Sequence, residues 1–116
     1  MTPPPGKECL FCAIAEGRIP ADLIYEDDRA LAFRDIRPQA PVHILVIPRR
    51  HLPSLNEVGE EDRELVGHLL RVAAEIARKE SVSLSGWRLT VNCGPDAGQA
   101  VDHLHFHVLG GRPLGW

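Results

Sequence analysis

The feature that most constrains this chain is the run His103-Leu104-His105-Phe106-His107-Val108 near its end. Histidine alternates with apolar residues at a period of two, which matches the alternation of side chains along a β-strand. In a strand the three histidines share one face, whereas on a helix their rings would spread over about 200° of arc. The pattern therefore predicts a strand whose apolar face lies on a core and whose histidine face lines a cleft.

Three interpretations of this histidine face are open. The first is a half-exposed strand that is merely rich in histidine. The second is a transition-metal site, since histidines at i and i+2 can chelate a metal. The third interpretation is phosphoryl or nucleotidyl transfer, in which one imidazole attacks phosphorus while its neighbours hold the oxygens and donate protons. Half of the chain's 6 histidines lie in this run, and the residues that flank it favour the third interpretation.

The bulk composition limits the class of protein. A chain of 116 residues predicts one small domain that can bury a core without disulfides. The net charge of −3 gives no basic surface for nucleic acid. No apolar run approaches the roughly 20 residues that a membrane span needs, and the N-terminus has no apolar signal region. We therefore expect a disordered leader at residues 1–7, a domain at residues 8–116, and a cytoplasmic location without nucleic-acid or membrane partners.

Residues 8–17 have a short helical pattern and contain Cys9 and Cys12, two of the chain's 3 cysteines. The C-x-x-C pair has three interpretations. It is two small buried side chains, or half of a zinc site that two imidazoles from elsewhere complete, because thiolates suit zinc and a tetrahedral site needs four ligands. A redox pair is the third, although no thioredoxin-like βαβ pattern surrounds it.

The remaining pattern predicts an α+β domain. The long amphipathic stretch at residues 60–80 is typical of a helix, and His68 within it is interpreted as a bystander. Further strands are expected at residues 23–26 and 30–34 (joined by a tight turn), 43–48 and 87–92. Short connections between successive strands favour an antiparallel sheet of about five strands, packed with one long and one short helix.

Several polar or flexible residues lie at the ends of these strands. Asp35 follows the second strand, where an aspartate commonly forms a turn. His43 opens the third strand, where a lone histidine is usually structural. The loop at residues 94–99 contains glycines that let backbone N–H groups approach a phosphate, so this loop is a candidate phosphate-binding segment.

The alternating histidines and the flanking Asn92-Cys93-Gly94-Pro95 and Gly110-Gly111-Arg112 segments resemble the signature of the histidine triad (HIT) family. The resemblance is strongest to the Hint branch of that family, whose members share the Gly-Gly-Arg segment and a Trp near the end. It spans nearly the whole chain, because Pro38-Gln39-Ala40-Pro41-Val42-His43 and Val46-Ile47-Pro48 also match in order. The resemblance implies the HIT fold and a homodimer whose two sheets join.

The resemblance also implies a chemistry. A Hint-like protein hydrolyses purine nucleoside 5′-phosphoramidates, with adenine or guanine as the base, to the nucleoside monophosphate through a covalent nucleotidyl-histidine, and needs no cofactor. By position in the motif His105 is the nucleophile and His107 donates to a phosphate oxygen. His103 and His43 orient the site and relay a proton to the leaving amine.

Binding residues carry over in the same way. Asp35 corresponds to the acid that accepts the ribose hydroxyls. Asn92 corresponds to a residue that donates to a phosphate oxygen or the bridging atom, and Phe11, Ile14 and Ile36 match the positions that hold the purine. Gly98 and Gln99 are added as nucleotide-binding candidates because they lie in the glycine-bearing loop beside the histidines. Some bacterial relatives carry the C-x-x-C pair and use it for structural zinc, which here implies the ligand set Cys9, Cys12, His51 and His103.

The chain departs from the Hint pattern at two places, and three other functions compete with phosphoramidate hydrolysis. Ala100 stands where Hint enzymes usually have a serine near the leaving group, and the chain ends at Trp116 without the Pro-Pro-Gly tail of that branch. The competing functions are dinucleoside polyphosphate hydrolysis of the Fhit type, a non-catalytic purine-nucleotide-binding or scaffold protein, and a zinc-dependent hydrolase. If His103 binds zinc, it cannot also carry a proton.

Overall fold

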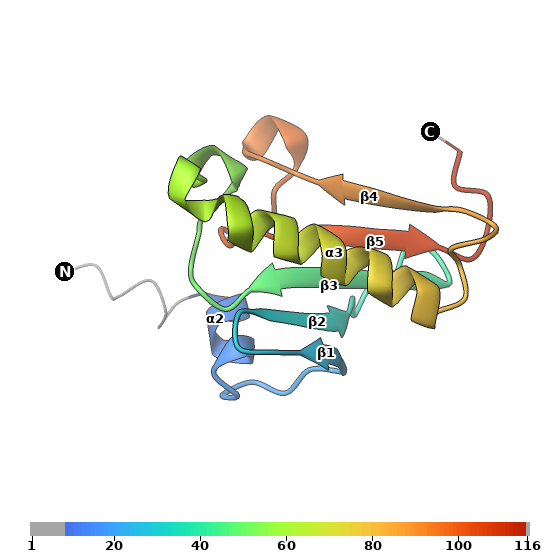
Figure 1. Cartoon of the computed structure of the whole chain (residues 1–116), viewed down its shortest axis with the longest axis horizontal. Helices are drawn as coiled ribbons and strands as arrows, with labels where there is room; N and C mark the ends of the chain where they lie inside the picture. The colour runs from blue at the N-terminus through green and yellow to red at the C-terminus, as the bar shows by residue number, and fades with distance from the viewer. Residues whose placement is uncertain (1–8, 116) are drawn as a thin grey trace.

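The structure is a computed structural model that describes residues 9–115. Five strands form one antiparallel sheet in the order β1-β2-β3-β5-β4 (Figure 1). This confirms the predicted fold class, while the predicted leader and Trp116 lie outside the described residues. In chain order the elements are α2 (Leu10–Ala15), β1 (Leu23–Glu26), β2 (Ala30–Arg34), β3 (Val42–Pro48), η1 (Leu55–Glu57), η2 (Glu60–Asp62), α3 (Arg63–Lys79), β4 (Trp87–Val91), η3 (Pro95–Ala97) and β5 (Phe106–Gly110).

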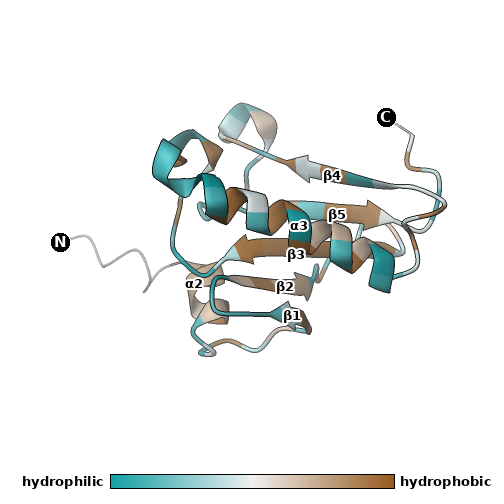
Figure 2. Ribbon diagram, in the orientation of Figure 1, coloured by the Kyte–Doolittle hydropathy of each residue, from teal (hydrophilic) through white to brown (hydrophobic). Residues whose placement is uncertain are grey.

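The sheet is covered on both faces, and the two faces follow from the alternation of side chains in the strands. On one face Ala30 and Ala32 of β2 pack with Leu69 and Ile76 of α3. On the other face Leu31 and its neighbours pack with Phe11 and Ile14 of α2. The middle strand β3 is apolar from Ile44 to Ile47 (Figure 2) because these residues contribute alternately to both layers. Within residues 9–115 the helices lack the length and apolar character that crossing a bilayer requires.

The histidine run keeps its predicted alternation but not its predicted extent. Leu104, Phe106 and Val108 lie in the core beneath α3, and the histidines face the opposite side. The strand, however, begins only at Phe106. Pairing with β3 stops there because Pro48 has no N–H to donate, and Leu104 N–H instead donates to the carbonyl of Leu52 at 2.6 Å.

Both helices are shorter than predicted. The turn at residues 60–62 is 3₁₀ rather than α-helical, because the carboxylate of Asp62 accepts the Gly59 N–H at 2.9 Å and pairs with Arg50. The N-terminal helix ends at Ala15, and Gly17 follows it at a φ of +77°, a conformation that favours glycine. The predicted stop at Gly17 is therefore close to the observed end.

His68 is not in the candidate site but holds the β1–β2 turn to α3. Its Nε2 lies 2.6 Å from Asp27 Oδ2, which also accepts from the hydroxyl of Tyr25 at 2.5 Å. The other carboxylate oxygen accepts the N–H groups of Arg29 and Ala30. Burial works to raise the pKa of Asp27, but these hydrogen bonds outweigh it and hold the pKa well below its usual range.

We expect Asp27→Asn to lower the free energy of unfolding by about 2 kcal/mol, because the charge-assisted bonds to Tyr25 and His68 are lost. Since the folded-state pKa is lowered, the contribution is present above about pH 4 and is lost as the pH falls below it. Urea unfolding at pH 7 and pH 3 measures both effects. The exposed neighbour Asp28→Asn is the control and should change the unfolding free energy by less than about 0.5 kcal/mol; equal losses for the two variants would contradict this account.

Candidate active site

Two cavities meet beside the histidine run. One is polar, with a volume of about 510 Å³, and the other is mainly apolar, with a volume of about 580 Å³. Both are lined by the same four residues, which are Asp35, Ala100, His105 and His107. A ligand with an apolar ring at one end and a charged group at the other could therefore fill both cavities across this junction.

The apolar cavity brings together the residues predicted to hold a purine. Phe11 and Ile14 come from α2 and Ile36 comes from the loop after β2. Phe11 also lies edge-on to the imidazole of His105, with ring centroids 5.1 Å apart. Helix α2 is thus a wall of this cavity and a neighbour of the central histidine.

The orientation of His105 is set by a backbone carbonyl. Its Nδ1 lies 2.7 Å from the oxygen of His103, and because a carbonyl oxygen only accepts, Nδ1 must carry the proton. The other nitrogen, Nε2, is then left with a free lone pair, and the residue lines both cavities. An imidazole in this state can act as a nucleophile or an acceptor.

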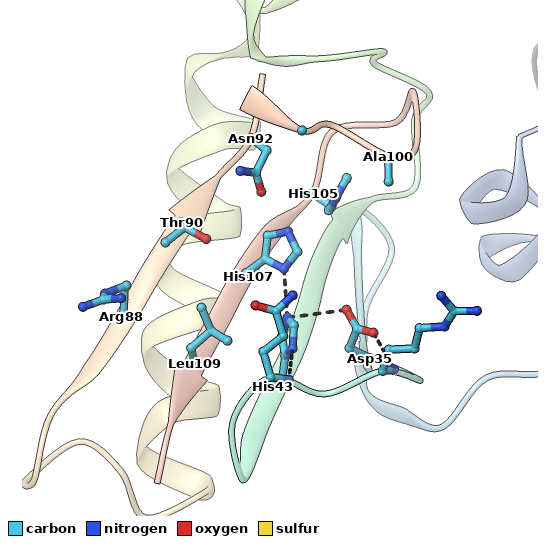
Figure 3. Close-up of a pocket in the computed structure, with 12 residues that line it drawn as sticks. Asp35, His43, Arg88, Thr90, Asn92, Ala100, His105, His107 and Leu109 are labelled. Carbon is cyan, nitrogen blue, oxygen red and sulfur yellow. Dashed lines mark hydrogen bonds and ion pairs between the residues drawn. The ribbon is translucent and has the colours of Figure 1, made fainter. Parts of the chain in front are cut away.

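A second chain of hydrogen bonds fixes His107. The backbone N–H of Gln39 donates to His43 Nδ1 at 3.0 Å, so His43 carries its proton on Nε2. That Nε2 lies 2.9 Å from His107 Nδ1 and 3.4 Å from Asp35 Oδ2 (Figure 3). His107 Nδ1 is therefore an acceptor, and its own proton is on Nε2, where it is available to a ligand in the cavity.

The pKa values agree with neutral rings. The pKa of His107 is lowered to about 4, first by burial and then by the neighbouring imidazoles of His105 and His43. Burial also lowers the pKa of His43, against the opposing influence of the Asp35 carboxylate. At neutral pH both rings are therefore uncharged, as the hydrogen-bond chain requires.

In the free protein we expect His107 to titrate near pH 4, because burial disfavours its charged form. Since this folded-state pKa is below the unfolded value of about 6.5, stability is lost as the pH falls from 6.5 through 4. Nuclear magnetic resonance of the ring nitrogens measures the midpoint directly. Asp35→Asn removes a charge that raises the pKa, so it should lower the midpoint; a midpoint at or above 6.5 in the unaltered protein would contradict the assignment.

The segment after β5 supports this chain from outside. Arg112 Nη2 donates to the carbonyl of Gln39 at 2.7 Å, which steadies the loop whose N–H holds His43. Gly111 has a φ of +96°, and a Cβ there would lie 2.8 Å from Pro41 Cβ. The Gly-Gly-Arg motif thus positions the Gln39 loop against the site.

The glycine loop is placed as predicted, but its side chains are used differently. Gly98 and Asn92 line the polar cavity, and the Asn92 amide donates to the carbonyl of Ala97 at 2.9 Å. Gln99 lines neither cavity. Its amide nitrogen donates to the carbonyl of Pro53 and its oxygen accepts the Gly94 N–H, so this side chain ties the glycine loop to the loop after β3 instead of facing a ligand.

His103 lies apart from the other two histidines. It lines neither cavity and is fully buried at 0% exposure. Its Nδ1 lies 3.2 Å from Cys9 Sγ and 3.4 Å from Cys12 Sγ, and Cys12 Sγ lies 3.2 Å from His51 Nδ1. The structure therefore does not bring its imidazole to the position that the predicted proton relay requires.

The four predicted zinc ligands form one group, with their ligand atoms all within 4.8 Å of one another. Zinc bond lengths of about 2.3 Å to sulfur and 2.0 Å to nitrogen place such atoms about 3.5 Å apart in a tetrahedron, close to the observed distances. His103 Nε2 lies 2.8 Å from the carbonyl of Pro48, so Nδ1 has a free lone pair aimed at both sulfurs. Donor types, spacing and tautomer all fit zinc.

Asp35, His43 and His107 form another group with metal-ligating atoms, but they fit a metal poorly. A metal on His43 Nε2 would displace its proton to Nδ1, where the Gln39 N–H already donates at 3.0 Å. Two N–H groups would then face each other. The arrangement is better suited to passing a proton than to holding a cation.

Sequence reasoning missed part of the polar cavity. Arg88 and Thr90 line it from β4, and they pair in register with Leu109 and His107 of β5. Alternate positions on an edge strand beside the histidine strand would have indicated them. Arg37 and Gln39 also line the cavity, and their position depends on the path of a loop, which no local pattern encodes.

Comparisons with known proteins agree with this geometry. The sequence profile of the HIT domain family matches residues 16–114 of this chain. The purine nucleoside phosphoramidase of Escherichia coli strain K12 is 47% identical over 109 residues, which cover 94% of this chain and 92% of that protein. A crystal structure of a HIT family hydrolase from Legionella pneumophila Philadelphia 1 has a TM-score of 0.93 and 49% identity, and covers 94% of this chain and 97% of that one.

A further solved structure bears on the cysteine cluster. It is a zinc-bound histidine triad family protein from Mycobacterium smegmatis, with a TM-score of 0.77 and 37% identity over 92% of this chain and 77% of that one. The family model and the high identity to relatives over most of their length confirm the resemblance predicted from the motif. This chain belongs to the HIT domain family.

Proposed function

We propose that this protein hydrolyses purine nucleoside 5′-phosphoramidates to the nucleoside monophosphate and an amine, through a nucleotidyl intermediate on His105. One observation carries the proposal. At the junction of an apolar and a polar cavity, His105 has its Nδ1 proton committed to a carbonyl, so a lone pair on Nε2 remains for attack. The name of the Escherichia coli relative supports the same activity.

The two cavities suggest how the substrate lies. The purine occupies the apolar cavity against Phe11, Ile14 and Ile36, and the α-phosphate lies at the junction. Asp35 is placed for the ribose hydroxyls. Its Oδ1 already accepts the Arg37 N–H at 2.8 Å, but a carboxylate has further lone pairs for two hydroxyls.

The reaction needs three contributions from the chain. His105 Nε2 attacks phosphorus, the P–N bond breaks, and the amine leaves with a proton. His107 Nε2–H is the donor that faces the phosphoryl group and the leaving amine, and His43 resupplies its proton through the 2.9 Å contact. Water then cleaves the nucleotidyl-imidazole and releases the monophosphate. His103 contributes through its carbonyl, which holds His105, and not as a proton carrier.

Incubation with an adenosine phosphoramidate and, separately, with a diadenosine polyphosphate tests the function. We expect rapid hydrolysis of the first, slow hydrolysis of the second, and no immediate loss of activity on addition of a chelator. Preferred cleavage of the polyphosphate would support the Fhit type instead. Binding of AMP without turnover of either substrate would support a non-catalytic nucleotide-binding protein, and immediate loss to the chelator would support a zinc-dependent hydrolase.

We also propose that Cys9, Cys12, His51 and His103 hold one structural zinc ion. When bound, the metal would serve as a cross-link between α2, the loop after β3 and the segment before β5. The fit of donors and tautomer supports this, as does the zinc-bound relative from Mycobacterium smegmatis. Elemental analysis should give about one zinc per chain.

The homodimer and the cytoplasmic location remain predictions, which sedimentation and cell fractionation can check.

A further inference from the structure

Helix α2 serves two groups at once. At its start Cys9 and Cys12 belong to the cysteine–histidine cluster. From the same six residues Phe11 and Ile14 form a wall of the apolar cavity. A helix of this length has little stability of its own, so its position depends on what it contacts at each end. The cysteine pair and the wall of the apolar cavity therefore lie less than two helical turns apart on one short helix.

His103 gives a second connection between the cluster and the site. Its imidazole Nδ1 faces the two sulfurs, and its Nε2–H donates to the carbonyl of Pro48. Its own carbonyl accepts from His105 Nδ1 at 2.7 Å. The group that fixes the tautomer of His105 thus belongs to a residue held in place by Cys9 and Cys12.

We propose that Cys9 and Cys12 are a site of reversible oxidation, in which a disulfide between them releases the metal and weakens nucleotide binding. The proposal rests on the proposed nucleotide function and on the proposed zinc ion. The oxidant is a hydroperoxide. The outcome is a protein whose affinity for purine nucleotides depends on the redox state of its surroundings.

The positions of the two cysteines suit this chemistry. Cys9 is the N-cap of α2 and Cys12 lies in its first turn, with the Cys12 N–H donating to Cys9 Sγ at 3.2 Å. The two sulfurs are within 4.8 Å of each other. Cys9 is half-buried, whereas Cys12 is buried, so we expect a small oxidant to react first with Cys9. When bound, the metal would keep both as thiolates, the reactive form.

The step balances in atoms and electrons. The Cys9 thiolate attacks the terminal oxygen of the hydroperoxide, the O–O bond breaks, and an alkoxide leaves. The Cys12 thiolate then attacks the sulfenic sulfur of Cys9, and hydroxide leaves as the S–S bond forms. Two electrons pass from the two thiolates to the peroxide. Two protons from solvent convert the alkoxide and hydroxide to an alcohol and water, and a thiol reverses the reaction.

A disulfide between Cys9 and Cys12 removes the sulfur partners of the His103 and His51 imidazoles. A disulfide has neither an S–H to donate nor a thiolate to share a metal, so the lone pair on the buried Nδ1 of His103 is left without a partner. An unpaired buried acceptor is costly, so the segment that carries His103 is expected to shift. Both the carbonyl that holds His105 and the wall formed by Phe11 move with it.

The test treats the reduced, zinc-loaded protein with hydrogen peroxide. Zinc release is followed with a chromogenic chelator, the linkage by peptide mass mapping, and AMP affinity by calorimetry. We expect one zinc released per chain, a Cys9–Cys12 disulfide, and a Kd for AMP raised by about tenfold or more, the loss of roughly one buried aromatic contact. Reduction with dithiothreitol followed by zinc should restore the original affinity.

Cys93→Ser is the matched control, because Cys93 is half-buried like Cys9 but lies outside the cluster; it should respond as the unaltered protein does. Retention of zinc, a linkage through Cys93, or an unchanged Kd after disulfide formation would each overturn the proposal. Failure of the proposed function is distinguishable, since the reduced, zinc-loaded protein would then neither bind AMP nor hydrolyse a phosphoramidate before any oxidant is added.

Discussion

His105→Ala is expected to lower kcat for an adenosine phosphoramidate by about 10⁴-fold or more, because it removes the proposed nucleophile. The substitution leaves the fold intact in this account. The ring is held by one carbonyl and packs on Phe11, and the core beneath α3 does not include it. AMP should therefore still bind, with a Kd within about tenfold of the original value, since the wall of the apolar cavity proposed to hold the purine is unchanged.

Single-turnover kinetics and calorimetry on the same preparation separate these two effects. His107→Gln is the graded comparison: it removes a donor but not the nucleophile and should cost about 10²-fold. Acid-quenched mass spectrometry should detect a nucleotidyl adduct on the unaltered protein and none on His105→Ala. If His105→Ala kept its activity within tenfold, or if the adduct mapped to another residue, the nucleophile would be misassigned.

The second large effect concerns stability. We expect Cys12→Ala to reduce bound zinc from about one per chain to none and to lower the free energy of unfolding by about 3–5 kcal/mol. The loss has two parts, the binding free energy of the metal and the buried lone pair of His103 that faces Cys12 Sγ at 3.4 Å. Urea denaturation with elemental analysis measures both.

Cys93→Ala is the comparison for this variant, because it removes a sulfur that has no part in the cluster; a loss below about 1 kcal/mol is expected. If Cys12→Ala were as stable as Cys93→Ala while the unaltered protein carried zinc, the metal would not hold the fold together. Zinc in Cys12→Ala at the original stoichiometry would mean that the ligands are other residues.

Local patterns predicted most of the fold and one half of the site. Alternation placed Leu104 and Phe106 in the core and the histidines on the opposite face, because a strand has two sides. Periodicity also located α3. The residue at which the histidine strand begins could not be predicted in this way. It depends on which residue of β3 would pair with Leu104, and in the observed register that residue is Pro48, which has no N–H to donate.

The tautomers and hydrogen-bond partners of the histidines could not be predicted from the sequence. The contact between His43 and His107 joins residues 64 positions apart, and it exists because β3 and β5 pair in one particular register. The proton on His43 is directed by the N–H of Gln39, a backbone group that any residue but proline could provide. The separation of His103 from the other two histidines likewise depends on the position of α2.

The sheet order has a consequence for synthesis. Strand β5 is the last of the five to leave the ribosome, yet it lies between β3 and β4 (Figure 1). Until it emerges, β3 and β4 have no partner between them, and the strand edges that later pair with β5 are exposed. We therefore expect the nascent chain to need protection from aggregation, and ligand binding to appear only when this closing strand has been inserted.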